Sequence, residues 1–412
     1  MSHPTTPSRL TRHRSFVLFW CARTSTNGAF MMQGVAVGWQ IYELTNDPFD
    51  LGLVGLVQFF PLLATSVIAG QVLDLFDRRV VAAVCQVGKA LAALALALGT
   101  AQGWLSREAM FAILFLSGTA RAFEIPTMHA ILPGIVPATL LPRAIAASAS
   151  AQQTAVICGP SIGGLLYALG PATVYATCTV VFVAAGVLVS LVQMAPRKEE
   201  RRPVSLATLF AGFGYIRSHP ILLGVISLDL FAVLLGGVTA LLPIYARDIL
   251  GAGPWALGLL RSAPAVGALA TSIVLAHRAI EGSAGRTMFM AVGLFGVASF
   301  VFGLSTSIVL SFLALVVYGA CDAVSVVIRQ SLVQMRTPYD MLGRVMAVNS
   351  LFTGSSGSLG EFRAGAVAAA VGAVPSALIG GVGTIVVMLA WMWLFPQLRR
   401  VDRLAPDVEP AR

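Results

Sequence analysis

Hydrophobic residues in this chain form long runs that short polar segments separate. A helix needs about 20 mostly apolar residues to cross the hydrocarbon core of a bilayer, and twelve runs meet that length. They cover 16–43, 51–73, 80–103, 108–130, 141–168, 172–194, 220–246, 254–277, 286–304, 308–335, 341–372 and 375–396. Strict alternation of apolar and polar residues is absent, which argues against the strands of an outer-membrane barrel. The pattern predicts an all-α integral membrane protein with twelve transmembrane helices.

Composition restricts the function as well as the fold. Of the 412 residues, 57% are hydrophobic and only 11% are charged, whereas a soluble protein has roughly 25% charged residues. Twelve spans leave only short loops, and the sequence has no HExxH motif, no Ser/His/Asp pattern and no cluster of His and Cys. We therefore expect neither an enzyme nor a metal site, and no organic cofactor.

Lys and Arg are distributed unevenly between alternate loops. With the N-terminus placed inside, inner loops and tails hold 19 of the 27 Lys and Arg residues, whereas outer loops hold only Arg107 and Arg247. This bias follows the positive-inside rule, so we expect both termini in the cytoplasm and the chain in the inner membrane of a bacterium. The same rule explains the net charge of +9. Since no basic cluster is interleaved with aromatic residues, nucleic acid is not an expected partner.

The chain consists of two related halves. The polar segment 196–203 separates six predicted spans from six more, and identical residues recur across it at a constant offset of 201 positions. The matched pairs are Gly118 and Gly319, Ala122 and Ala323, Pro137 and Pro338, Arg143 and Arg344, Ala146 and Ala347, Gly159 and Gly360, and Gly164 and Gly365. Transporters are built from such parallel repeats. We predict two pseudo-symmetric six-helix bundles, 1–195 and 220–412, joined by a cytoplasmic linker, 196–219.

The loop between the second and third spans carries a charged motif. Its signature residues are Gly70, Asp74, Arg78 and Arg79. A glycine allows close helix packing, and an acid at a helix end meets a neighbouring Arg or the positive start of another helix; an ordinary charged turn would carry the same residues. The stretch resembles the G-x-L-A-D-R-x-x-R-R signature of the major facilitator superfamily, with Leu73 and Leu75 departing from it. That resemblance implies a cytoplasmic gate at which the acid latches the two halves.

Two further stretches resemble branches of the same superfamily. The fifth span contains Gly159-Pro160-Ser161-Ile162-Gly163-Gly164, which is similar to the G-P-x-x-G-G core of the antiporter signature and implies export. The eleventh span resembles that of the branch containing enterobactin exporters and macrolide efflux pumps. Its distinctive polar residues are Asn349, Glu361 and Arg363. We expect Glu361 and Arg363 to form either a structural or outer-gate pair or a substrate contact.

Charged residues occur inside the predicted spans, where a charge costs at least a few kcal/mol unless it faces a cavity or a partner. The candidates for the substrate and proton pathway are Arg23, Arg121, Glu124, Asp229, Asp322 and Arg329. They fall in the first, fourth, seventh and tenth spans, which line the central cavity in the superfamily that the chain resembles. At the offset of 201, Asp322 is the repeat-mate of Arg121, so we expect these opposite charges to face each other. Structural salt bridges are the alternative, and Lys89 and Arg261 are interpreted as snorkelling residues.

The resemblance implies a secondary active transporter that works by alternating access. We expect a proton-coupled antiporter that exports a small, siderophore-like molecule, with the proton as the coupling ion. Efflux of lipophilic drugs or macrolides is the alternative within this class, and a membrane sensor without net transport is a remote one. The expected partners are the small-molecule substrate and the lipid bilayer, and the expected state is a monomer.

Overall fold

The computed structural model describes residues 10–194, 206–277 and 283–401, apart from the side chains of 66–71, 73–74 and 206–210. Within this part all regular structure is helical. The helices longer than one turn are α1 (Arg14–Thr45), α2 (Pro48–Leu75), α3 (Arg78–Gln102), α4 (Arg107–Ile131), α5 (Leu141–Tyr167), α6 (Pro171–Ser190), α7 (Leu206–Ser218), α8 (Pro220–Gly236), α10 (Pro254–His277), α11 (Ala284–Leu304), α12 (Ile308–Met335), α13 (Tyr339–Val371) and α14 (Ala373–Leu394). Short pieces follow α8 (α9, Leu242–Ile244) and α14 (α15, Pro396–Arg399).

Each of the twelve predicted ranges is mainly helical, with a break inside 220–246, but not every helix has the composition of a span. Among the described residues, 9 helices are long and apolar enough to cross a membrane. The helices α1, α5 and α13 fall short although they have 32, 27 and 33 residues. Composition rather than length is the reason, because these helices carry intramembrane charges or many Ser, Thr and Gln residues. The count of twelve spans therefore stays a prediction for these three helices.

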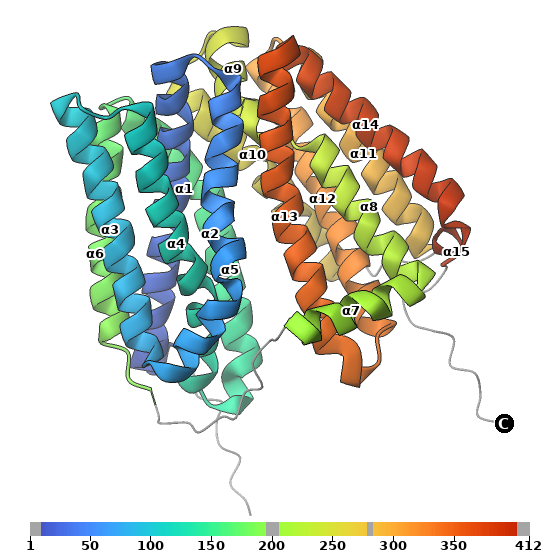
Figure 1. The fold of residues 1–412 in the computed structure, drawn as a ribbon, viewed down its shortest axis with the longest axis horizontal. Helices are drawn as coiled ribbons and strands as arrows, with labels where there is room; N and C mark the ends of the chain where they lie inside the picture. Colours follow the sequence, from blue (N-terminus) through green and yellow to red (C-terminus); the bar gives the residue numbers. More distant parts are fainter. Residues whose placement is uncertain (1–9, 195–205, 278–282, 402–412) are drawn as a thin grey trace, which may run out of the picture. The chain divides into compact units, whose positions relative to one another are not determined.

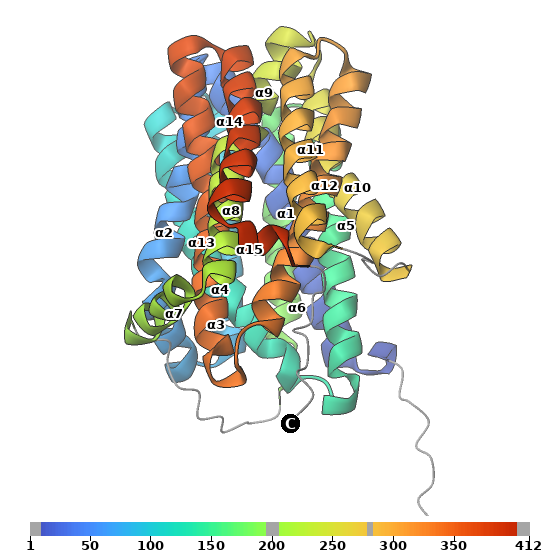
Figure 2. The same cartoon turned by 90° about the vertical axis from the view of Figure 1, so that its right-hand side faces the viewer.

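The described chain divides into two compact units (Figure 1). Unit 1 comprises Met1–Leu44 and Val57–Pro203, and unit 2 comprises Thr45–Leu56 and Val204–Arg412. The first turns of α2 therefore group with the second unit, on which Gly52 lies directly against the backbone of Phe362. The segment predicted as a linker also contains the helix α7, which lies across the ends of α8 and α13 (Figures 1 and 2). The domain bounds drawn from the sequence stay a prediction.

Repeat-mate glycines make the same helix contact in each unit. A Cβ on Gly118 of α4 would lie 2.9 Å from the carbonyl oxygen of Gln58 in α2. Its mate Gly319 lies on α12 against the backbone of Pro264 in α10. In unit 1 α4 touches α2, and in unit 2 α12 touches α10; at both contacts no side chain separates the two helix backbones. Counted without α7, these are the fourth and second helices of each unit. Glycine is required at such a close approach because any side chain would clash.

A second pair of repeat-mates shows the same equivalence. Gly159 of α5 lies against α1, where a Cβ would come within 3.0 Å of the carbonyl oxygen of Gly28. Gly360 of α13 lies against α8, with the corresponding distance of 2.7 Å to the carbonyl oxygen of Val233. Both contacts join the fifth long helix of a unit to the first, so the internal repeat read from the sequence is a repeat of packing.

The helix α8 breaks at Gly237, which has an extended backbone (φ −62°, ψ 111°). Arg363 of α13 donates to the carbonyl oxygens of Leu234 and Leu235, at 2.9 and 2.6 Å. Thr384 of α14 donates to Ala232 at 3.2 Å, and the remaining donor is Ser299 of α11, 3.5 Å from the oxygen of Gly236. A helix end in hydrocarbon must satisfy its last carbonyl groups, and here side chains of α11, α13 and α14 do so.

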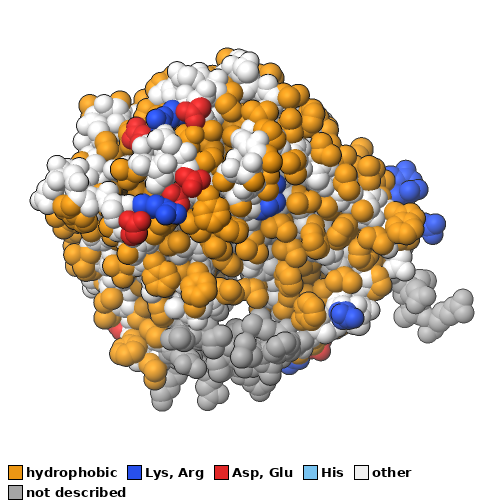
Figure 3. Space-filling view, turned by 45° about the horizontal axis from the view of Figure 1, so that its top comes forward, with side chains coloured by type: hydrophobic (Ala, Val, Ile, Leu, Met, Phe, Trp, Pro, Cys, Tyr) orange, Lys and Arg blue, Asp and Glu red, His pale blue; other side chains and the backbone are white. Residues whose placement is uncertain are grey.

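The outer surface matches an apolar solvent. Figure 3 shows a face on which hydrophobic side chains cover most of the centre and right, while a group of charged side chains lies at the upper left. Large apolar residues are more than half exposed on many helices, such as Val183 on α6, Leu294 on α11 and Trp393 on α14. Exposed apolar surface of this extent is not found on soluble monomers, so lipid is the medium that these helices face.

Candidate functional site

In unit 1 the central charges of α3 and α4 form a buried cluster. Lys89 donates to one carboxylate oxygen of Glu124 at 2.6 Å, and the amide of Gln86 donates to the other at 2.7 Å. The Lys89 ammonium also lies 4.8 Å from the ring centroid of Phe182 on α6. Lys89 has no exposed surface. Its interpretation as a snorkelling residue is therefore wrong, because the carboxylate of Glu124 supplies a partner inside the bundle.

Arg121 lies one turn before Glu124 on α4 but does not pair with it. Its guanidinium lies over the ring of Phe30 on α1, 3.6 Å from the centroid. A cation held on an aromatic face is stabilised by roughly 0.5–2 kcal/mol and keeps its N–H groups available. Among the described residues of unit 1, Arg121 has no acidic partner within ion-pair distance.

Arg23 of α1 lies among polar groups of α4 and α5. Its guanidinium is 3.5 Å from Nε2 of His129 and donates to the side-chain oxygen of Gln152 at 3.3 Å. Neither Arg23 nor Arg121 forms an ion pair with Glu124, whose carboxylate binds Lys89, although both lie within electrostatic reach of it. The sequence analysis missed His129 and Gln152, because single polar residues without a motif give no signal.

In unit 2 the charges predicted for the substrate and proton pathway lie on α8 and α12. Arg329 and Asp229 form a buried ion pair, with side chains 2% and 8% exposed. Asp322 lies two turns before Arg329 and lines the same small cavity as Asp229, together with Phe295, Cys321 and Ser325. In the described part of unit 2, Asp322 has no ion-pair partner within 4 Å. The predicted pairing of Asp322 with Arg121 joins the two units and stays a prediction.

The three polar residues of α13 have different surroundings. Arg363 binds the carbonyl groups at the break in α8, which is a structural role. Glu361 lies against Gly55, where a Cβ would come within 2.5 Å of its carboxylate, and lies within electrostatic reach of Arg261 on α10. Asn349 is buried nearer the start of α13. Glu361 and Arg363 therefore do not pair with each other, which corrects one of the two expected arrangements.

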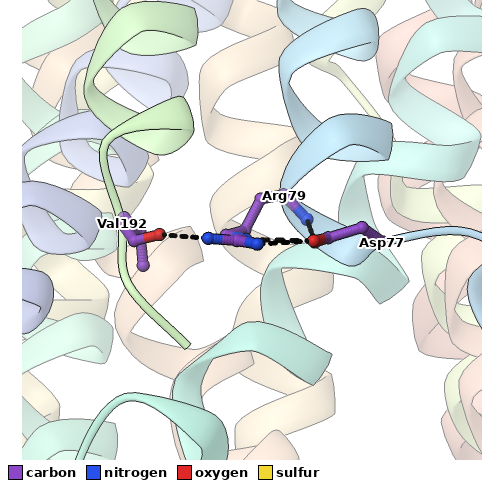
Figure 4. A network of polar contacts seen from close by, with 3 residues as sticks. All are labelled: Asp77, Arg79 and Val192. Carbon is purple, nitrogen blue, oxygen red and sulfur yellow. Dashed lines mark hydrogen bonds and ion pairs between the residues drawn. The ribbon is translucent and has the colours of Figure 1, made fainter. Parts of the chain in front are cut away.

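Among the described side chains of the loop between α2 and α3, Asp77 makes the contacts that fix the start of α3 (Figure 4). Asp77 caps α3 by accepting from the backbone N–H of Arg79 at 2.9 Å, and its carboxylate also accepts from the Arg79 guanidinium at 2.6 Å. Arg79 donates in turn to the carbonyl oxygen of Val192 after α6, and Arg78 donates to Ala130 at the end of α4. The hydrogen bonds that Asp77 accepts from Arg79 hold the pKa of Asp77 below its ordinary value. The side-chain surroundings of Gly70 and Asp74 lie outside the described part.

The glycines of the fifth-span motif form a packing surface on α1. Gly163 lies against the backbone of Met32, as Gly159 does against Gly28, and Gly164 is buried beside them. Pro160 lies between them inside the continuous helix α5. The motif therefore joins α5 to the helix that carries Arg23.

Comparison with known proteins agrees with this architecture. Residues 5–410 match the family described as "Transmembrane secretion effector". The enterobactin exporter EntS of Citrobacter koseri is 26% identical over 413 residues, covering 97% of this chain and 96% of the relative. That of an Escherichia coli strain is 26% identical over 414 residues, with the same coverage.

Solved structures share the fold at low sequence identity. The nucleoside transporter NupG (D323A mutant) superposes with a TM-score of 0.73 at 14% identity, covering 92% of this chain and 100% of that one. A bacterial homologue of the iron transporter ferroportin gives 0.69 at 18% identity, covering 93% and 99%. The chain therefore belongs to the transmembrane secretion effector family and is a multi-pass membrane transporter of the major facilitator superfamily, not an enzyme.

Proposed function

We propose that the protein is a proton-coupled antiporter that exports a small anionic, siderophore-like molecule from the bacterial cytoplasm. One observation carries the proposal: Glu124 and Asp229 are both engaged in ion pairs, whereas Arg121 and Asp322 have no ion-pair partner among the described residues of their own units. The relatives named as enterobactin exporters support the class of substrate. Arginine suits an anion with several oxygens, because its guanidinium donates in a planar fork.

In the proposed mechanism, Arg121 and Arg23 bind the substrate in unit 1 and Asp322 carries the proton in unit 2. Alternating access moves the substrate by rocking of the two halves. Protonation of Asp322 drives this change only if its affinity for protons differs between the two states. The lone carboxylate meets that requirement better than Asp229, because Asp229 must break its ion pair with Arg329 before it can accept a proton.

Flux in proteoliposomes tests the coupling. With the wild-type chain, an imposed pH gradient should drive transport of a catecholate siderophore, and unlabelled siderophore should exchange with labelled siderophore without a gradient. Asp322→Asn should abolish gradient-driven flux and retain exchange, whereas Asp340→Asn, at an exposed acid on α13, should leave both unchanged. Gradient-driven flux of wild-type size in Asp322→Asn would transfer the coupling role to Asp229 or Glu124.

The charge of the substrate separates siderophore export from drug efflux. Arg121→Gln should lower the apparent affinity for an anionic catecholate about tenfold, since a hydrogen bond to a charged group contributes about 1.5–3 kcal/mol. The same variant should leave transport of a neutral lipophilic compound unchanged. Transport of a macrolide but not of a catecholate by the wild-type chain would favour the alternative of drug efflux.

The orientation and the gate are parts of the same proposal. We place both termini in the cytoplasm on the distribution of Lys and Arg. Cysteines introduced at Ser283 and Ser307 should then be labelled from opposite sides, with Ser283 inside, and labelling from one side would contradict the twelve-span topology. Asp74→Ala should stop transport and retain substrate binding, whereas Asp77→Ala should lower stability more than transport, because Asp77 is engaged with Arg79.

A further inference from the structure

A second cavity lies at the end of unit 2 where α8 begins and α12 ends. Its volume is about 450 Å³, and it is open on one side. Most of its wall is apolar and comes from Pro220, Ile221, Leu222, Met335 and Pro338. The polar groups are those of His219, Arg336, Thr337 and Gln397. Since none of the charges assigned to the transport pathway lines it, this cavity is separate from the proposed substrate site.

Among the residues that line this cavity, Arg336 is the one whose side chain always carries a charge. One of its nitrogen atoms makes no hydrogen bond within the described residues. The Nε atom is buried and has no hydrogen-bond partner among the described residues. A buried donor without a partner costs about 1–3 kcal/mol, so a shift of the Arg336 side chain that brings this N–H group to an acceptor in the cavity is favourable. Thr337 does not serve, because its hydroxyl donates to the carbonyl oxygen of Val333 at 2.6 Å.

The surroundings of the cavity favour an anion. The helix α8 begins there with Pro220, and His219 makes no side-chain hydrogen bond to its first amides, which leaves the positive end of the helix facing the cavity. Exposed arginines lie next to the lining residues in the chain: Arg217 precedes His219, and Arg399 and Arg400 follow Gln397. Asp340 is the nearest acid in the sequence, and it is exposed two residues after Pro338.

The position of the cavity relative to the membrane indicates the source of the anion. The spans that contain α8 and α12 are Pro220–Ile249 and Ile308–Met335, so the cavity lies where two apolar helices end. Lipid headgroups lie at this level of a bilayer, and basic pockets between helices bind anionic headgroups there. The apolar wall can pack against the glycerol and first methylene groups while the guanidinium binds the phosphate.

We propose that this cavity binds the phosphate group of an anionic phospholipid, with Arg336 as the main contact. A free phosphate ester would offer Arg336 the same phosphate group, but the apolar wall of the cavity favours the lipid. The proposal does not depend on the exported substrate or on proton coupling.

Thermal unfolding of the full chain, purified in a neutral detergent, tests the site. Phosphatidylglycerol should raise the melting temperature in a saturable way, whereas phosphatidylcholine, which carries no net charge, should have little effect. Arg336→Gln should weaken the apparent affinity for phosphatidylglycerol about tenfold. Arg143→Gln, which removes an exposed arginine of α5 in unit 1, should bind as the wild type does and so controls for attraction between the whole protein and charged lipid.

A second variant keeps the test decisive if Arg336→Gln does not fold. Ile221→Trp fills the cavity and retains Arg336, and it should abolish the effect of phosphatidylglycerol. A saturable effect of inorganic phosphate or glycerol phosphate that both variants abolish would support the site with a soluble ligand as its source. Equal responses of the wild type, Arg336→Gln and Ile221→Trp to the lipid would overturn the proposal.

Discussion

The two units share a backbone scaffold but not their buried ion pairs. Gly118 and Gly319 make equivalent contacts, as do Gly159 and Gly360, and the repeat-mates Pro137 and Pro338 have nearly identical backbone angles (ψ 148° and 149°). The buried ion pairs are unrelated by the repeat. In unit 1 Lys89 of α3 pairs with Glu124 of α4. In unit 2 Asp229 of α8 pairs with Arg329 of α12, and these two helices are the counterparts of α1 and α4.

This difference separates what duplication preserved from what each half acquired. At the offset of 201, Glu124 corresponds to Ser325 and Asp229 corresponds to Gly28, so neither ion pair has a counterpart. Positions that set the distance between helices are shared because both bundles need the same packing. The positions of the buried ion pairs differ, because a transporter needs each half to contribute different chemistry to the pathway.

The largest expected effect comes from splitting the ion pair of unit 1. Lys89→Met leaves the buried carboxylate of Glu124 without its cation, which should lower the free energy of unfolding by about 3–5 kcal/mol. Adding Glu124→Gln, which keeps the acceptor for Gln86, should recover most of this loss. Thermal unfolding in detergent measures both variants. A double variant that stays as unstable as Lys89→Met would show that the unpaired charge of Glu124 is not the cause of the lost stability.

The corresponding experiment in unit 2 sharpens the comparison. Arg329→Met should destabilise the protein to a similar extent, and Arg329→Met with Asp229→Asn should recover stability. If both double variants fold, their transport rates show which pair belongs to the pathway. If only the double variant of unit 1 recovers transport, the Lys89–Glu124 pair is structural and the Asp229–Arg329 pair belongs to the transport pathway.

The next effect concerns the break in α8, which has no counterpart in α1. Arg363→Met removes the donors to Leu234 and Leu235 and should cost about 2–3 kcal/mol. Arg344→Met makes the same change at an exposed position of the same helix and should have almost no effect. Equal melting temperatures of Arg363→Met and the wild type would mean that water or lipid replaces the arginine at these carbonyl groups.

Smaller losses are expected at the shared glycines. Gly118→Ala and Gly319→Ala each place a methyl group against a backbone, which should cost about 1–3 kcal/mol, with the larger loss at Gly319, where the helices are closer. Gly357→Ala on α13 is the control, because no atom lies within 4 Å of the added group. A loss at only one of the two positions would break the equivalence of the scaffold.

The smallest effect is a pH dependence confined to unit 1. Hydrogen bonds from Arg79 depress the pKa of Asp77, so the folded state binds this proton less readily than the unfolded state does. The contribution to stability is then complete above the ordinary pKa of about 4 and is lost as the pH falls through the depressed value. It should not exceed about 1 kcal/mol, since the carboxylate is partly exposed. The difference in melting temperature between the wild type and Asp77→Asn should vanish at low pH.

Sequence analysis predicted the helices and the repeat well, because runs of apolar residues and recurring glycines report directly on membrane spans and helix contacts. It identified the intramembrane charges as a set but did not assign their partners. The pairing of Lys89 with Glu124 depends on the relative rotation of α3 and α4, and that of Asp229 with Arg329 joins residues 100 positions apart. The role of Asp77 was missed because Asp74 occupies the position of the family signature.

The break in α8 has a genetic consequence. Its carbonyl groups depend on residues 299, 363 and 384, which lie far from residues 232–237 in the chain and donate to different carbonyl groups of the same helix end. Substitutions at these distant positions should therefore show strong epistasis with one another, since each leaves the rest to support the same exposed helix end. A change of sequence that allowed the helix to continue through Gly237 would remove the need for Arg363. In related chains with an unbroken helix here, an apolar residue at the position of Arg363 should therefore be tolerated.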